Sequence, residues 1–245
     1  MVEVLSQIDV INGIFTLGMV IVNTAVGAVL IWKSRETKSR PLLAMGIALI
    51  LLVSPWFTNS INFLLIISNL PSLTPELHLA MSLVPLPIAN FAWMVMITDL
   101  LLKKRQKPIL IIYFAYAVFF NVVVLTLLPI DSTLVGTFDS PIDTVYSSLI
   151  SGLILVLLMT VQVNSLLFFV RSRRAESPEA RLKATFFLIS TTTFVVASIL
   201  DSRATFEGVA FIIIIRFLLL LGAIEIYWAF LLPDYVKKVF IRSKI

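Results

Sequence analysis

Seven long apolar stretches, each able to cross a lipid bilayer as a helix, constrain the fold of this chain more than any other feature. A hydrocarbon core of about 30 Å requires about 20 helical residues. The stretches fall at residues 10–32, 41–68, 77–102, 108–130, 144–170, 182–200 and 206–232. Short connections join them and leave no room for a soluble domain. The pattern predicts one domain, an all-α membrane protein built as a seven-transmembrane-helix bundle.

Composition supports this prediction and excludes several other classes of protein. Of the 245 residues, 59% are hydrophobic and 13% are charged, whereas soluble chains carry roughly 25% charged residues. The mean hydropathy of +1.03 is too high for a soluble enzyme, a secreted disulfide scaffold or a disordered regulator. Apolar residues are continuous rather than alternating, which favours helices over a membrane β-barrel. We therefore expect a multi-pass integral protein of the cell membrane.

Three segments have the composition of helix starts. They are Thr74-Pro75-Glu76, Ser140-Pro141-Ile142-Asp143 and Ser177-Pro178-Glu179. In each, a hydroxyl side chain can cap the helix, proline suits the first turn, and an acid complements the helix dipole. Pro41 and Pro108 open the second and fourth stretches in the same way. We expect helices to begin at all five positions.

The distribution of basic residues predicts the orientation of the bundle. Of the 19 lysines and arginines, all but Arg203 and Arg216 lie in three alternate loops, at 33–40, 103–107 and 171–183, and in the C-terminal tail. The positive-inside rule places these loops in the cytoplasm, with the N-terminus outside and the C-terminus cytoplasmic. The same charges suit anionic lipid headgroups, whereas no basic stripe interleaved with aromatics indicates a nucleic-acid site.

The chain has few of the residues that usually carry out catalysis or bind metal ions. The chain has no cysteine, and His78, its single histidine, lies beside the predicted outer boundary. No lysine lies in the interior of a stretch, because Lys183 is at the cytoplasmic end of the sixth; a retinal Schiff base therefore has no attachment point. We expect no enzyme activity, no metal and no cofactor.

Arg216 is the most unusual residue, because it lies about ten residues, or roughly 15 Å, inside the seventh stretch. Exposing arginine to lipid there costs at least about 2.5 kcal/mol, so its guanidinium should point into the bundle. Asp99 and Glu225 lie toward the cytoplasmic end, Asp99 in reach of Lys103 and Glu225 in reach of the basic loops. We therefore expect no carboxylate at the level of Arg216. Two interpretations remain open: an arginine satisfied by amides, carbonyls and water, or an anchor for an anion.

Polar and aromatic residues at mid-depth of the second and third stretches form the other candidate site. Asn59 and Asn62 share one helical face, and Asn90 and Trp93 share another, by their spacing of three residues. These residues can act as polar contacts between helices, or they can line an outward-facing pocket with Arg216 at its floor. The candidate ligand-binding set is Arg216, Asn59, Asn62, Asn90, Trp56 and Trp93. Such a set suits an amphiphilic or anionic small molecule.

Three segments resemble the seven-helix sensor modules at the N-terminus of some histidine kinases. They are Leu77–Lys107, a proline-containing helix that ends in a basic turn, the segment Phe168–Arg174 that leads into the Ser-Pro-Glu cap, and the leucine-rich seventh stretch. This resemblance implies signal transduction across a membrane. The chain ends thirteen residues after Leu232, so we expect no output domain and a cytoplasmic signalling protein as its partner.

A second pattern leaves an alternative open. The first stretch with its basic loop and the fifth with its own are loosely alike, as in small sugar transporters with parallel 3+1+3 repeats. We therefore expect a receptor-like or sensory protein, with a small-molecule transporter or channel as the alternative. Candidate partners are membrane lipids, an amphiphilic or anionic ligand, a cytoplasmic signalling protein and a second copy in a homodimer.

Overall fold

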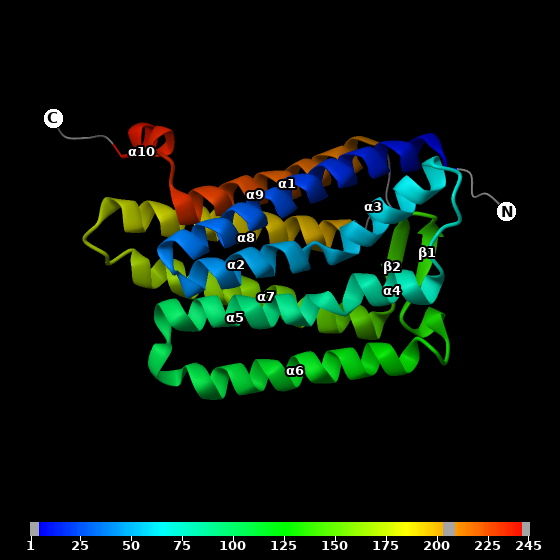
Figure 1. Cartoon of the computed structure of the whole chain (residues 1–245), viewed down its shortest axis with the longest axis horizontal. Helices are drawn as coiled ribbons and strands as arrows, with labels where there is room; N and C mark the ends of the chain where they lie inside the picture. Colours follow the sequence, from blue (N-terminus) through cyan, green and yellow to red (C-terminus); the bar gives the residue numbers. More distant parts are fainter. Residues whose placement is uncertain (1–4, 203–208, 242–245) are drawn as a thin grey trace.

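The computed structural model describes residues 5–202 and 209–241, and nearly all of them are helical. The elements are α1 Gln7–Thr37, α2 Arg40–Leu52, α3 Ser54–Ile67, α4 Pro75–Leu83, α5 Pro85–Leu101, η1 Lys103–Arg105, α6 Gln106–Leu127, η2 Ser132–Leu134, β1 Gly136–Ser140, β2 Asp143–Tyr146, α7 Ser148–Ser172, α8 Pro178–Asp201, α9 Val209–Leu231 and α10 Asp234–Phe240. Figure 1 shows the long helices side by side, with the described ends of the chain at opposite ends of the bundle.

Six helices are long and apolar enough to cross a membrane, and the total is seven if the bent pair α2 and α3 counts as one span. The six include α4 and α5 taken together as Pro75–Leu101. The predicted set of apolar helices is thus confirmed for the described residues. Residues 206–208, the predicted start of the seventh stretch, lie outside the described residues.

The second stretch is not one straight helix. A bend of 48° separates α2 from α3. Pro55 explains it, because proline has no N–H and cannot bond the carbonyl four residues earlier, that of Leu51. The N–H of Val53 bonds that carbonyl instead. The bend therefore gives α3 a direction of its own at one end of the bundle.

One predicted helix start is wrong. Ser140-Pro141-Ile142-Asp143 forms the turn of an antiparallel hairpin, in which Ser140 pairs with Asp143 and Gly136 with Tyr146. Helix α7 begins after the hairpin, where Ser147 accepts a hydrogen bond from the N–H of Ile150. The fifth span therefore starts at residue 148 rather than 144, and the chain is not purely α-helical.

The other two predicted caps are confirmed. Thr74 accepts a hydrogen bond from the Leu77 N–H, and Ser177 accepts one from the Ala180 N–H. Proline opens α2 as predicted, whereas α6 begins two residues before Pro108.

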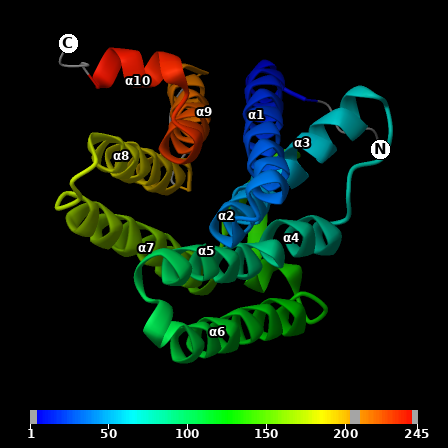
Figure 2. The same cartoon turned by 60° about the vertical axis from the view of Figure 1, so that its left-hand side comes forward.

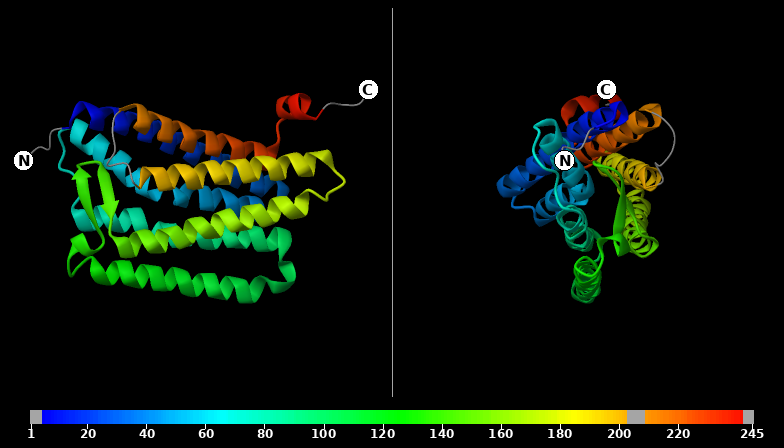
Figure 3. Two further views of the ribbon diagram at one scale, coloured as in Figure 1. Left: turned by 180° about the vertical axis from the view of Figure 1, so that it is seen from behind. Right: turned by 90° about the vertical axis from the view of Figure 1, so that its right-hand side faces the viewer.

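The two ends of the bundle differ in chemistry, and we name them by their contents. The hairpin end contains β1, β2 and the first residues of α1, and the basic end contains loops 33–40, 103–107 and 171–183 together with α10 (Figures 1 and 3). The largest apolar core cluster joins α1, α2, α5, α7, α8, α9 and α10. Helix α6 packs mainly on α5 and lies at the edge of the bundle in the end-on view (Figure 3).

Candidate functional site

Arg216 forms an ion pair at the hairpin end. It is 3% exposed, and its Nη1 donates to Asp201 Oδ1 at 2.6 Å. Its Nε donates to Thr16 Oγ1 at 2.8 Å and to Asn12 Oδ1 at 3.2 Å, and its Nη2 donates to Asn12 Oδ1 at 3.1 Å. Trp56 Nε1 donates to the second carboxylate oxygen, Asp201 Oδ2, at 2.8 Å. This arginine network joins α1, α3, α8 and α9.

The expectation that no carboxylate lies at the level of Arg216 is wrong. Asp201 is the last residue of α8, and α9 runs back alongside α8 (Figure 1). The long arginine side chain can therefore reach the end of the neighbouring helix. The network around Arg216 belongs to the first, second, sixth and seventh apolar stretches, whereas a pocket between the second, third and seventh was expected. The inward orientation of the guanidinium is confirmed, and its role as an anion anchor stays a prediction.

A second polar network surrounds His78, which is 1% exposed. Its Nδ1 lies 3.3 Å from Asn62 Nδ2, and its Nε2 lies 3.1 Å from Asn59 Oδ1 and 3.2 Å from Thr144 Oγ1. The ring also meets Phe138 edge-on, with centroids 5.0 Å apart. The histidine network therefore links α3, α4 and the hairpin.

The partners of Asn62 determine the tautomer of His78. The Leu73 N–H donates to Asn62 Oδ1 at 2.8 Å, and Asn62 Nδ2 donates to the Pro141 carbonyl at 2.8 Å. The amide nitrogen therefore faces the imidazole, so His78 Nδ1 must accept a hydrogen bond and carry no proton. The proton is on Nε2, where Asn59 Oδ1 accepts it. A second proton on Nδ1 would break the contact with Asn62, so the network requires the neutral ring.

Helix α3 contributes to both networks. Trp56 belongs to the arginine network, and Asn59 and Asn62 belong to the histidine network. Ser54, the first residue of α3, donates to the Ser82 carbonyl of α4 at 2.6 Å. Because α3 continues from α2 after the 48° bend, it connects both networks to α2.

The remaining two predicted site residues lie elsewhere, in α5. Asn90 Nδ2 donates to the Leu157 carbonyl of α7 at 3.2 Å. Trp93 stacks on Phe187 of α8, with centroids 5.2 Å apart and planes at 18°. Asn90 Oδ1 and Trp93 Nε1 are buried without a hydrogen-bond partner among the described residues. The six predicted residues therefore occupy three places and do not line one common pocket.

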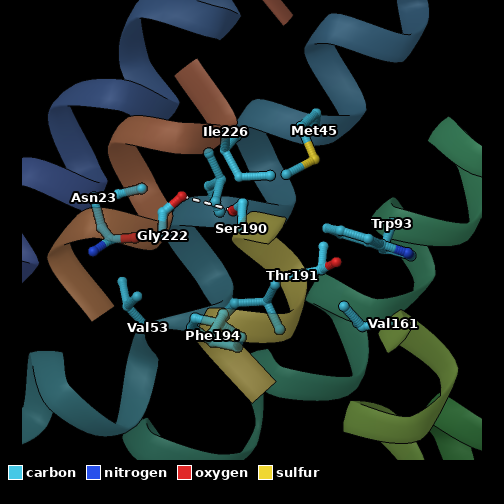
Figure 4. A pocket seen from close by; sticks show the side chains of 13 residues that line it. Asn23, Met45, Val53, Trp93, Val161, Ser190, Thr191, Phe194, Gly222 and Ile226 are labelled. Carbon is cyan, nitrogen blue, oxygen red and sulfur yellow. Dashed lines mark hydrogen bonds between the residues drawn. The ribbon is translucent and has the colours of Figure 1, made fainter. Parts of the chain in front are cut away.

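A small cavity lies next to the bend, where α1, α2, α5, α7, α8 and α9 converge (Figure 4). Its volume is about 20 Å³, close to the space that one water molecule requires. Asn23, Val53 and Trp93 are among its lining residues, and on one wall Ser190 Oγ donates to the Gly222 carbonyl at 2.7 Å (Figure 4). An organic ligand does not fit a cavity of this size.

A larger groove opens at the hairpin end. Its volume is about 390 Å³. It lies between the turn of the hairpin and the segment that precedes α4, and its lining residues are Asn62, Ser72, Leu73, Pro75, Phe138, Asp139, Ser140 and Pro141. Asn62 belongs to the histidine network as well, so a molecule in the groove would touch that network directly.

Carboxylates dominate the hairpin end. In the described ranges they are Asp9, Glu76, Asp131, Asp139, Asp143 and Asp201. Burial raises the pKa of Asp143 to about 6, with a further increase from the Asp201 charge and an opposing decrease from Arg216. Hydrogen bonds from Thr133 lower the pKa of the exposed Asp131. Asp139 lies in the wall of the groove itself, which favours cations over anions there.

At the basic end, one of two charge predictions is confirmed. Asp99 pairs with Lys103, and Arg40 Nε lies 3.4 Å from its second oxygen. Glu225 does not pair with a basic loop in residues 5–202 and 209–241; its Oε2 is buried without a hydrogen-bond partner there. In the same ranges, no group of three or more His, Asp or Glu side chains is placed to hold a metal ion.

The candidate set from the sequence lacked five residues of these networks: His78, Asn12, Thr16, Asp201 and Thr144. Asn12 and Thr16 lie one helical turn apart in the first stretch, a spacing that signals a shared polar face. Asp201 falls one residue beyond the sixth stretch, and Thr144 lies in a segment predicted to be helical.

No protein-family model matches the chain, and neither does any curated protein.

Proposed function

We propose that this chain is a receptor-like or sensory membrane protein that transmits a signal from the hairpin end to a cytoplasmic partner at the basic end. One observation carries the proposal. Helix α3 holds residues of both polar networks, and the 48° bend joins it to α2, which packs in the largest core cluster. A ligand that shifts α3 would therefore change the packing of α2, because close-packed interiors transmit displacement.

The distribution of polar groups supports a receptor over a transporter. The two networks and the groove lie at the hairpin end. The largest core cluster, toward the basic end, consists of apolar side chains such as Leu30, Met45 and Phe187. Transport requires a polar path through the whole bundle. The cavity of about 20 Å³ beside the bend is too small to provide one.

The groove of about 390 Å³ is the proposed entry for the ligand. Asn62 and Asp139 in its wall, and the surrounding carboxylates, suit a polar neutral or cationic molecule. An acidic ligand at Arg216 is less favoured, because the guanidinium already donates to Asp201, Asn12 and Thr16. In the proposed orientation the groove faces the outside, as the positive-inside rule requires.

Spin labels can test the relay through α3. The chain has no cysteine, so Leu43→Cys on α2 and Lys104→Cys after α5 create unique labelling sites at the basic end. Trp56→Phe removes the indole donor to Asp201, together with part of the ring that packs against Phe194. We expect it to shift the distance distribution between the labels, whereas Trp32→Phe, at a side chain that is 60% exposed, should leave it unchanged.

Two outcomes would contradict the proposal. An unchanged distribution in both Trp56→Phe and Asn62→Leu would show that α3 relays nothing to the basic end. Flux of protons, potassium or glucose into proteoliposomes, above that of protein-free vesicles, would favour the transporter alternative.

A further inference from the structure

We infer that α10 is an interfacial helix that binds the acidic phospholipid surface of the membrane at the basic end. This inference requires only that α9 crosses the membrane, and it is independent of the proposed receptor function. The turn that precedes α10 sets the direction of this helix. Leu232 adopts a left-handed conformation with φ 42°, and Pro233 then starts α10 in a new direction. Figures 1 and 2 show α10 lying across the end of α9.

One face of α10 is held against the bundle. Val236 is 2% exposed and belongs to the largest core cluster. The Phe240 ring meets Phe186 of α8 edge-on, with centroids 5.4 Å apart. Lys237 Nζ lies 3.2 Å from Glu179 Oε1 at the start of α8. These contacts hold α10 in one orientation relative to α8 and α9.

An adjacent face of α10 is apolar and exposed. Tyr235 is 59% exposed and Val239 is 70% exposed, and the two share a face because they are four residues apart. Tyr235 also accepts a hydrogen bond from Trp228 Nε1 at 3.1 Å, which places a tyrosine and a tryptophan together at the end of a span. Aromatic pairs of this kind are typical of the membrane–water interface.

Charge determines which lipid suits this face. Lys238 is adjacent to Val239, is exposed, and forms no ion pair with a residue in the described ranges. The neighbouring loop 171–183 is basic overall, because Arg171, Arg173, Arg174, Arg181 and Lys183 outnumber Glu176 and Glu179. A surface that combines apolar side chains with lysine inserts into the headgroup region and is attracted to anionic lipids. Phosphatidylglycerol or a comparable acidic phospholipid is therefore the expected occupant.

Collision accessibility of a spin label tests this inference. Val239→Cys provides the only thiol of the full chain, which is reconstituted in nanodiscs of phosphatidylcholine alone or of phosphatidylcholine with phosphatidylglycerol at roughly 3:1, a mixture that gives the surface a negative potential. We expect the label to be accessible to oxygen and shielded from an aqueous nickel chelate when the acidic lipid is present. Lys238→Gln should weaken the acidic-lipid effect about fivefold, because one lysine near such a surface contributes about that factor.

Lys104→Gln is the matched control, because it removes an exposed lysine at the same end but outside α10. It should leave the accessibility of the label at position 239 unchanged. Full exposure of that label to the nickel chelate in both lipid mixtures would overturn the inference. Equal shielding in the two mixtures would overturn its acidic-lipid part and reduce α10 to a generic interfacial helix.

Discussion

At the residue scale, the ion pair between Arg216 and Asp201 shows how this chain accommodates a charge inside an apolar bundle. Neither partner is isolated: Asn12 and Thr16 accept from the guanidinium, and Trp56 donates to the carboxylate. Removing one member of a buried ion pair destabilises a fold by more than the intact pair stabilises it, because the remaining charge is left buried without a counter-charge. The network is therefore expected to behave as a unit.

Arg216→Met keeps the volume and removes the charge. We expect it to lower the free energy of unfolding by about 3 kcal/mol, since it leaves the partly buried Asp201 carboxylate without its positive partner. The double variant with Asp201→Asn should recover part of this loss, because a neutral amide needs no counter-charge. Thermal unfolding in detergent measures both. Equal stability of Arg216→Met and the parent would show that water replaces the guanidinium.

At the element scale, α1 and α2 pack with their backbones in contact. A Cβ atom added at Gly46 would lie 2.6 Å from the carbonyl oxygen of Gly27, and a backbone atom cannot move aside easily. Small residues allow such close approach between membrane helices. The contact also places α2 against the helix that carries Asn12 and Thr16.

Gly46→Ala should therefore destabilise the fold by about 1–3 kcal/mol through overpacking. Gly18→Ala is the matched control, since a Cβ atom there meets nothing within 4 Å and alanine favours the helix. We expect the control to be neutral or stabilising in the same thermal unfolding assay. A loss at Gly18 equal to that at Gly46 would contradict the packing argument.

The hairpin has a pH dependence of its own through Asp143. The pKa of this carboxyl group is about 6 in the folded protein, above the value of 3.8 for an ordinary aspartate, so the folded protein binds the proton more tightly than the unfolded chain does. Between these two values stability falls as the pH rises, and above about pH 6 the penalty is complete. Asp143→Asn should therefore raise stability near neutral pH by about 2–3 kcal/mol and leave it nearly unchanged at about pH 4.

The control for this prediction is Asp131→Asn, at an exposed hairpin-end carboxylate with a lowered pKa. The Asp131 carboxylate stabilises the folded protein, and this stabilisation is lost only when the pH falls below the ordinary pKa of aspartate. It should not alter the difference in stability between roughly pH 5 and pH 7, because that carboxylate stays ionised throughout this range. An Asp143→Asn variant that follows the parent at every pH would show that Asp143 is solvated.

At the scale of the whole molecule, the two ends of the bundle carry opposite charge. We expect the hairpin end to face outward and the basic end to face the cytoplasm. In intact cells, an impermeant thiol reagent should modify Thr133→Cys and Ser202→Cys but not Lys104→Cys or Arg174→Cys. Labelling of the latter pair from outside would reverse the proposed orientation. Permeabilised cells, in which all four sites should react, provide the control.

That the chain forms six or seven long apolar helices followed from the sequence, because crossing a membrane requires about 20 consecutive apolar residues and that demand is local. The caps at Thr74 and Ser177 were predictable for the same reason, since each depends on residues within one turn. The apparent cap at Ser140 failed because pairing with Asp143 across a hairpin competes with the same local signal.

Only the tertiary structure decided which polar residues meet. The pair of Arg216 with Asp201 joins two neighbouring helices, and the contact of Asn62 with His78 spans the turn between two others. Asn90 and Trp93 have the same helical spacing as Asn59 and Asn62, yet they face α7 and α8 instead. Sequence spacing determines which side chains share a face of one helix. It does not determine which neighbouring helix that face meets, because packing of the whole bundle sets the rotation of each helix.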